Sequence, residues 1–141
     1  MMRRITALGS ARATIATGLA LAIVERRVGL AALLGTALSH VLVQVLKRTV
    51  RRGRPADAHG VSLALIDLPD PFSFPSGHAA AAFAVAVPVA AAHAWLAPFA
   101  LGLAGLVAVS RVALRVHWPG DALAGSILGA LGAIAAWQLL P

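Results

Sequence analysis

One polar cluster near the C-terminal third of the chain pairs a histidine with an aspartate. Ser110-Arg111 is followed by His117 and, four residues later, by Asp121. If His117 belongs to the first turn of a helix, Asp121 falls on the same helical face. A carboxylate on one imidazole nitrogen fixes the tautomer and leaves the other nitrogen free to attack. The alternative is an interfacial histidine beside an acid that complements the helix dipole.

Two earlier clusters carry groups that bind anions. Lys47 and Arg54 supply a point charge and a planar fork for phosphate oxygens. Pro-Ser-Gly-His follows, in which Ser76 is a good N-cap, Gly77 admits a ligand close to the backbone, and His78 can donate a proton. A helix N-terminus is itself an anion site. The alternatives are positive-inside flanking charges and an ordinary capped helix start.

Long apolar runs must position these clusters. The 141 residues are 60% hydrophobic and only 12% charged, which is about half the charged fraction of a soluble domain. A membrane helix needs about 20 residues, and the mostly apolar stretches are 5–24, 28–46, 77–93, 96–114 and 119–139. The prediction is an all-α, integral-membrane bundle of about five transmembrane helices in a single domain, 1–141. The count falls to four if 5–24 lies on the surface, and a cleaved signal peptide is an alternative there.

Alternating helix directions bring the three clusters to one membrane face. The helix 28–46 ends there, 77–93 starts there, 96–114 ends there and 119–139 starts there. That face gathers three cations, two histidines, one aspartate and a helix N-terminus. Such a set is typical of an oxyanion site with a nucleophile and an acid.

The charge balance indicates which kinds of molecule the protein binds. Net charge is +7, from 12 Lys and Arg against five acids, which suits anionic headgroups or a phosphorylated substrate. Nucleic acid is not expected, because the basic residues border apolar segments. Cysteine is absent, which removes disulfides and thiolate metal sites. No acidic cluster stands ready for a divalent ion, and Asp57, Asp67 and Asp70 are interpreted as solvated loop residues.

Together the clusters carry a family resemblance. The chain resembles the type 2 phosphatidic acid phosphatase superfamily, which includes lipid phosphate phosphatases, bacterial undecaprenyl-diphosphate phosphatases and vanadium haloperoxidases. Its signature is Lys, six residues, Arg-Pro; Pro-Ser-Gly-His; and Ser-Arg, five residues, His, three residues, Asp. The matching residues, within a motif core at 47–121, are Lys47, Arg54-Pro55, Pro75-Ser76-Gly77-His78, Ser110-Arg111, His117 and Asp121. Membrane members often have two full helices before the helix that carries the first motif, whereas here only about one precedes that helix, 28–46.

The resemblance implies a mechanism. His117 attacks phosphorus, Asp121 orients the imidazole, and His78 protonates the leaving oxygen and then helps to activate water. The residues implied to bind phosphate are Lys47, Arg54, Ser76, Gly77 and Arg111. Three cations take the place of a metal ion, so no metal or other cofactor is expected. The predicted activity is metal-independent hydrolysis of a lipid phosphate through a phosphohistidine.

Substrate, membrane face and oligomeric state stay open at this stage. The candidate substrates are a polyprenyl diphosphate, a polyprenyl-linked sugar phosphate, phosphatidic acid and phosphatidylglycerol phosphate. The expected location is a bacterial plasma membrane. Family members acting on lipids usually face outward, whereas the positive-inside rule places this site in the cytoplasm. The main alternative is a non-catalytic lipid-phosphate-binding membrane protein of the same fold; a vanadate-dependent haloperoxidase and a transporter subunit fit less well.

The remaining histidines and tryptophans receive structural interpretations. His40 shares a helical face with Lys47 and could line the cavity, but packing is the favoured role. His93 is expected at the opposite membrane surface, and His59 in the loop near headgroups. The expected interfacial anchors are Trp95, Trp118 and Trp137, and Trp118, beside His117, could also touch substrate. Gly125 and Gly129 have the GxxxG spacing of helix–helix contacts.

Overall fold

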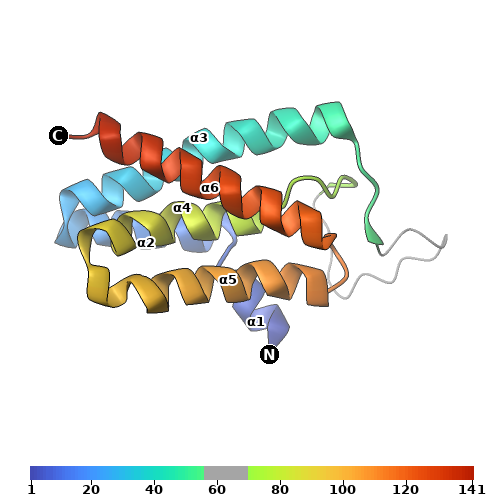
Figure 1. The fold of residues 1–141 in the computed structure, drawn as a ribbon, viewed down its shortest axis with the longest axis horizontal. Coiled ribbons are helices and arrows are strands. Elements are labelled where there is room, and N and C mark those ends of the chain that lie inside the picture. The colour runs from blue at the N-terminus through green and yellow to red at the C-terminus, as the bar shows by residue number, and fades with distance from the viewer. Residues whose placement is uncertain (56–69) are drawn as a thin grey trace.

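A bundle of helices makes up the described part of the computed structural model, residues 1–55 and 70–141 (Figure 1). Asp57, His59 and Asp67 lie outside the described residues. The elements are α1 (Met2–Ala7), α2 (Ala11–Val24), α3 (Arg26–Val50), α4 (Gly77–Ala92), the 3-10 turn η2 (Ala94–Leu96), α5 (Ala97–Ala113) and α6 (Pro119–Leu139). The all-helical prediction is confirmed.

Among the described residues, three helical segments are long and apolar enough to cross a membrane: Arg26–Val50, Ala94–Ala113 and Pro119–Leu139. The helices α2 and α4 are apolar but shorter, with 14 and 16 residues. The prediction of one helix over 5–24 is wrong, because the chain breaks between α1 and α2. The hydroxyl of Ser10 accepts a hydrogen bond from Ala13 N at 3.3 Å, and this cap starts a new helix.

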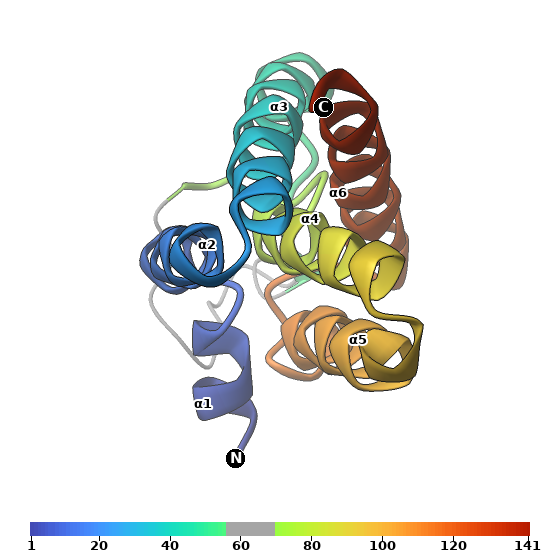
Figure 2. The ribbon, with the colours of Figure 1, turned by 90° about the vertical axis from the view of Figure 1, so that its left-hand side faces the viewer.

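The central element is α4, which packs against α3, α5 and α6 (Figure 2). Small residues permit the close packing. A Cβ atom on Gly125 or Gly129 would overlap the carbonyl oxygens of Ser76 and Ala80, respectively. The GxxxG pair of α6 is therefore covered by α4 of the same chain, which is the close backbone approach that small residues allow in membrane proteins.

The helix directions place all three motif clusters at one end of the bundle, as the sequence predicts. In Figure 1, α3 and α5 end on the side where α4 and α6 begin. At the other end, His93 Nε2 lies 2.7 Å from Glu25 Oε2, so the expected location of His93 opposite the motifs is confirmed. Arg27 stacks over Trp137 at this end, with its guanidinium carbon 4.4 Å from the ring centroid.

Two left-handed residues terminate the helices that lead into the motif end. Arg51 caps α3 with φ 49°, and its N–H donates to Lys47 O at 3.1 Å. Arg115 follows α5 with φ 58°. A non-glycine residue in this region costs about 1–2 kcal/mol. These turns redirect the chain so that the segments carrying Arg54 and His117 lie over the end of the bundle.

Candidate active site

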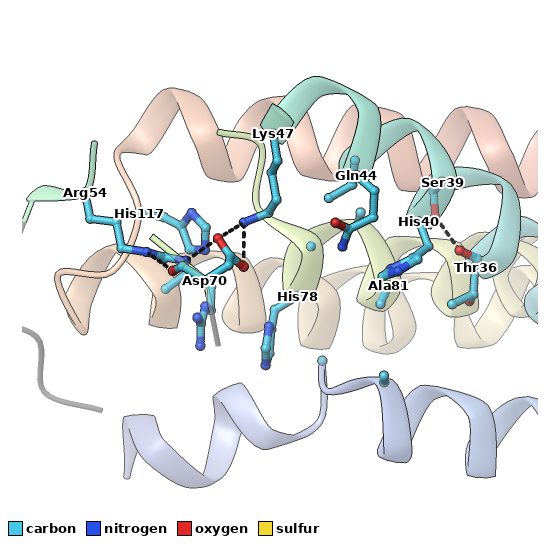
Figure 3. Close-up of a pocket in the computed structure, with 16 residues that line it drawn as sticks. Thr36, Ser39, His40, Gln44, Lys47, Arg54, Asp70, His78, Ala81 and His117 are labelled. Atoms are coloured by element: carbon cyan, nitrogen blue, oxygen red, sulfur yellow. Dashed lines mark hydrogen bonds and ion pairs between the residues drawn. The ribbon is translucent and has the colours of Figure 1, made fainter. Parts of the chain in front are cut away.

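A cavity of about 430 Å³ opens at the motif end (Figure 3). The predicted site residues that line it are Lys47, Arg54, Gly77, His78, Arg111 and His117. The two others, Ser76 and Asp121, are fully buried behind its wall. Residues from three separate motifs therefore meet in one cavity.

His117 lies in the α5–α6 link rather than in the first turn of the last helix. Its backbone precedes Trp118, the N-cap, and α6 begins only at Pro119, whose ring favours the first helical position. The His117 side chain is 3% exposed, and its Nδ1 lies 2.6 Å from Ser73 O. A carbonyl oxygen only accepts, so Nδ1 carries the proton and Nε2 keeps a free electron pair.

The surroundings of His117 keep its imidazole neutral. Burial lowers the pKa of His117 to about 2, and the charges of Arg111, Arg54 and Lys47 act in the same direction. The hydrogen bond to Ser73 opposes these effects but is weaker. A neutral imidazole with an unprotonated Nε2 is the nucleophilic form of histidine.

Asp121 does not make the hydrogen bond to His117 that the motif implies. Its Oδ2 lies 3.8 Å from His117 Nδ1, which is too far for a hydrogen bond. That oxygen instead accepts from Trp118 N at 2.8 Å, and Oδ1 accepts from Arg52 Nη1 at 3.1 Å. The carbonyl of Ser73 therefore holds the imidazole, while Asp121 supplies a negative charge beside it. The difference arises because His117 lies outside the helix, where four-residue spacing does not align side chains.

Ser76 and Gly77, both implied to bind phosphate, lie in different positions: Ser76 is buried at the start of α4, and Gly77 lines the cavity. Ser76 caps α4, and its hydroxyl accepts from Ala79 N at 3.5 Å. Its own N–H donates to Asp121 O at 2.9 Å, which ties the start of α4 to that of α6. Only Gly77 of the two reaches the cavity wall.

Asp70 occupies the space between two of the cations, so its interpretation as a solvated residue is wrong. Lys47 Nζ donates to both of its carboxylate oxygens, at 2.9 and 3.1 Å. Arg54 Nη2 donates to Oδ1 at 3.1 Å. Burial works to raise the pKa of Asp70, but the Lys47 hydrogen bond, the charges of Lys47 and Arg54, and the Phe72 N–H together lower it below its ordinary value. Asp70 is thus an internal anion on the cation cluster.

Arg111 is held from an unexpected place. Its Nη1 donates to the hydroxyl of Thr6, in α1, at 2.7 Å. Both residues are buried, at 3% and 6% exposed. Within the described residues, Arg111 Nε is buried without a hydrogen-bond partner. A buried polar group left in this way costs about 1–3 kcal/mol, which a bound anion would recover.

His40 lines the cavity too, together with Gln44, so packing was the wrong interpretation of this histidine. The shared face with Lys47 was the signal that placed it here. No comparable signal pointed to Thr6, Ser73 or Asp70. Among residues 1–55 and 70–141, no three His, Asp or Glu side chains gather as metal ligands.

The fold and cavity together define an integral-membrane helical protein with a buried cationic site around a neutral histidine. The chain belongs to the PAP2 superfamily, whose family model matches residues 28–141. The α1 and α2 helices precede the matched region, so Thr6 lies outside it.

Relatives of this family include phosphatases of lipid-linked substrates. The decaprenylphosphoryl-5-phosphoribose phosphatase of Mycobacterium tuberculosis is 38% identical over 111 residues, covering 78% of this chain and 60% of the relative. The undecaprenyl-diphosphatase of Sulfolobus acidocaldarius is 32% identical over 105 residues, covering 74% of this chain and 51% of the relative. The chain thus spans between half and two thirds of the length of these relatives.

Two crystal structures share the fold. Aquifex aeolicus LpxE superposes with a TM-score of 0.87 and 26% identity, covering 97% of this chain and 83% of that protein. A transmembrane PAP2-type phosphatidylglycerolphosphate phosphatase from Bacillus subtilis has a TM-score of 0.77 and 30% identity, covering 98% of this chain and 74% of that protein.

Proposed function

We propose that this protein is a metal-independent membrane phosphatase that cleaves a lipid-linked phosphate through a phosphohistidine on His117. The observation that carries the proposal is a buried, neutral His117 whose Nδ1 is bound to Ser73 O, in a cavity with three cationic side chains. Decaprenyl and undecaprenyl lipids in the relatives' names support a polyprenyl-linked substrate.

The reaction has two steps. First, Nε2 of His117 forms a bond to phosphorus while the bond from phosphorus to the leaving oxygen breaks, and His78 gives that oxygen a proton. Second, water attacks phosphorus, the P–N bond breaks, and His78 takes the proton of the water. Asp121, 3.8 Å from the ring, stabilises the positive charge that His117 gains in the first step.

Lys47, Arg54 and Arg111 neutralise charge on the phosphoryl oxygens, which is the main catalytic demand of phosphoryl transfer. Two of these cations hold the Asp70 carboxylate in the present structure. Substrate binding therefore exchanges one anion for another on Lys47 and Arg54, and adds a partner for Arg111.

The test is phosphate release by the full-length protein, purified in detergent, from a panel of lipid phosphates with EDTA present. We expect release by the wild type and none by His117→Ala. His93→Ala, at the opposite end of the bundle, is the matched control and should remain active. Absence of release from every lipid by a folded wild type, with retained lipid-phosphate binding, would favour the non-catalytic binding protein instead.

A further inference from the structure

The cavity continues past the cation cluster along α3. Thr36, His40 and Gln44 line it, and their four-residue spacing puts them on one helical face. Figure 3 shows them in a row leading away from Lys47. At a rise of 1.5 Å per residue, Gln44 lies about 4.5 Å and His40 about 10 Å along the helix from Lys47. We call these three residues the polar arm.

The polar arm sits in one of the long apolar segments, where polar side chains are costly and tend to face a substrate path. Thr36 satisfies its own hydroxyl proton, donating to Ala32 O at 2.7 Å. Figure 3 draws no hydrogen bond from His40 or Gln44 to the other cavity residues. Within residues 1–55 and 70–141, the imidazole of His40, on the exposed side of the cavity, and the half-buried carboxamide of Gln44 are therefore available to a ligand.

Small residues complete the lining of the cavity beside the polar arm. They are Gly9 and Ala11, from the α1–α2 link and the start of α2, and Ala80 and Ala81 of α4. A Cβ on Gly9 would come 2.8 Å from His78 O, so this link already approaches α4 closely. The total volume of about 430 Å³ is that of a small-molecule pocket and exceeds the need of one phosphate group.

We infer that the polar arm binds a sugar that joins the cleaved phosphate to the lipid, so that the substrate is a lipid-linked sugar phosphate. This inference rests on the proposed function. Sugar hydroxyls both donate and accept, which matches the carboxamide of Gln44 and the imidazole of His40. An alkyl or prenyl chain in the same place would leave both groups unpaired, and such mismatches discriminate strongly between substrates.

The experiment compares two substrates with the same polyprenyl chain: a polyprenyl-phosphoryl pentose phosphate and a polyprenyl diphosphate. The full-length protein is assayed in detergent, and kcat and KM are measured separately. For the wild type we expect at least about tenfold higher kcat/KM on the sugar phosphate, since a site built around hydroxyls rejects analogues that lack them.

The variants Gln44→Leu and His40→Leu should reduce this preference toward unity, mainly through a higher KM for the sugar phosphate. His40→Gln, which keeps hydrogen-bonding capacity, should retain part of it. Leu42→Ala is the matched control, because Leu42 is on α3, is 47% exposed and does not line the cavity; it should keep the wild-type preference. Thermal unfolding of each variant verifies that it is folded.

Equal or better hydrolysis of the diphosphate by the wild type would overturn the inference and leave the proposed phosphatase intact. Equal losses of kcat/KM on both substrates in Gln44→Leu and His40→Leu would overturn it too, because the polar arm would then not distinguish the sugar phosphate from the diphosphate. No phosphate release from either substrate, or from any other lipid phosphate, would instead overturn the proposed function.

Discussion

The two ends of the bundle carry similar residue types in very different settings. At the motif end, Lys47, Arg54 and Arg111 are each no more than 6% exposed. At the opposite end, the side chains of the Glu25–His93 pair are 42% and 39% exposed. Exposed pairs contribute about 0–1 kcal/mol, whereas burial of charge requires several kcal/mol of compensation per ion.

Both ends also have an arginine beside a tryptophan. Arg27 lies 4.4 Å from the Trp137 centroid, and Arg52 lies 5.5 Å from that of Trp118. Both ends therefore carry an arginine–tryptophan pair, which is typical of a residue cluster that anchors a protein at the membrane interface. What distinguishes the motif end is the buried cation cluster, which membrane anchoring does not require. The comparison teaches that buried charge, rather than charge alone, marks the site.

The largest effect should come from replacing equivalent residues at the two ends. His117→Ala removes the nucleophile and should lower kcat by about 10⁴-fold or more, as loss of a central catalytic residue does. His93→Ala should stay within about twofold of the wild type. Phosphate release under saturating substrate measures both. Comparable losses in the two variants would remove the functional distinction between the ends.

Replacement of Asp70, the internal anion at the motif end, should have a smaller effect. Asp70→Asn removes the charge that competes for Lys47 and Arg54, so inorganic phosphate should inhibit about tenfold more strongly, an effect of about 1.4 kcal/mol. The inhibition constant of phosphate measures this. Glu25→Gln at the other end is the control and should leave it unchanged. Weaker inhibition of Asp70→Asn would mean that Asp70 organises the cations instead of competing with substrate.

Removal of the hydrogen bond between Arg111 and Thr6 of α1 should have a still smaller effect. Thr6→Val removes the hydroxyl that accepts from Arg111, and we expect a roughly threefold to tenfold rise in KM, which is about 1 kcal/mol for one hydrogen bond. Thr6→Ser should rescue it. Thr14→Val is the matched control, because Thr14 is also buried, at 3% exposed, but among the described residues its hydroxyl donates only to carbonyls at the start of α2. A similar KM change in Thr14→Val would indicate general loosening rather than a specific contact.

The pH dependence of the free energy of unfolding should also distinguish the two ends, in stability rather than in activity. The folded-state pKa of His117 is lowered to about 2. As the pH falls, the unfolded state therefore binds a proton that the folded state does not bind. Its contribution is complete above the unfolded pKa of about 6.5 and declines as the pH falls toward 2. Between pH 7 and pH 5 the free energy of unfolding should drop by about 2 kcal/mol from this residue.

The control for this effect is His117→Gln, which does not titrate but can still donate to Ser73 O. Its free energy of unfolding should change less than that of the wild type over the same pH range. An identical slope in wild type and His117→Gln would mean that His117 is not kept neutral by its surroundings.

Local sequence predicted the parts of the site that depend on helix ends. Ser76 caps α4 because cap chemistry acts over three residues, and the motif clusters meet because helix direction alternates. Thr6 and Arg111 are 105 residues apart, and His117 and Ser73 are 44 apart; no periodicity encodes such contacts. The four-residue rule failed at Asp121 because His117 lies before the helix, and cap geometry cannot be read to within two residues from sequence.

The most direct test of the central claim is to trap the phosphorylated enzyme. His78→Ala should slow hydrolysis of the intermediate, and a lipid diphosphate can still form it because its phosphate leaving group departs without a proton from His78. This variant is therefore mixed with labelled polyprenyl diphosphate, quenched in base, digested and sequenced by mass spectrometry. We predict base-stable, acid-labile phosphate on His117, and none in the double variant His78→Ala/His117→Ala. Phosphate on another residue, or substrate turnover by His117→Ala, would contradict the proposed mechanism.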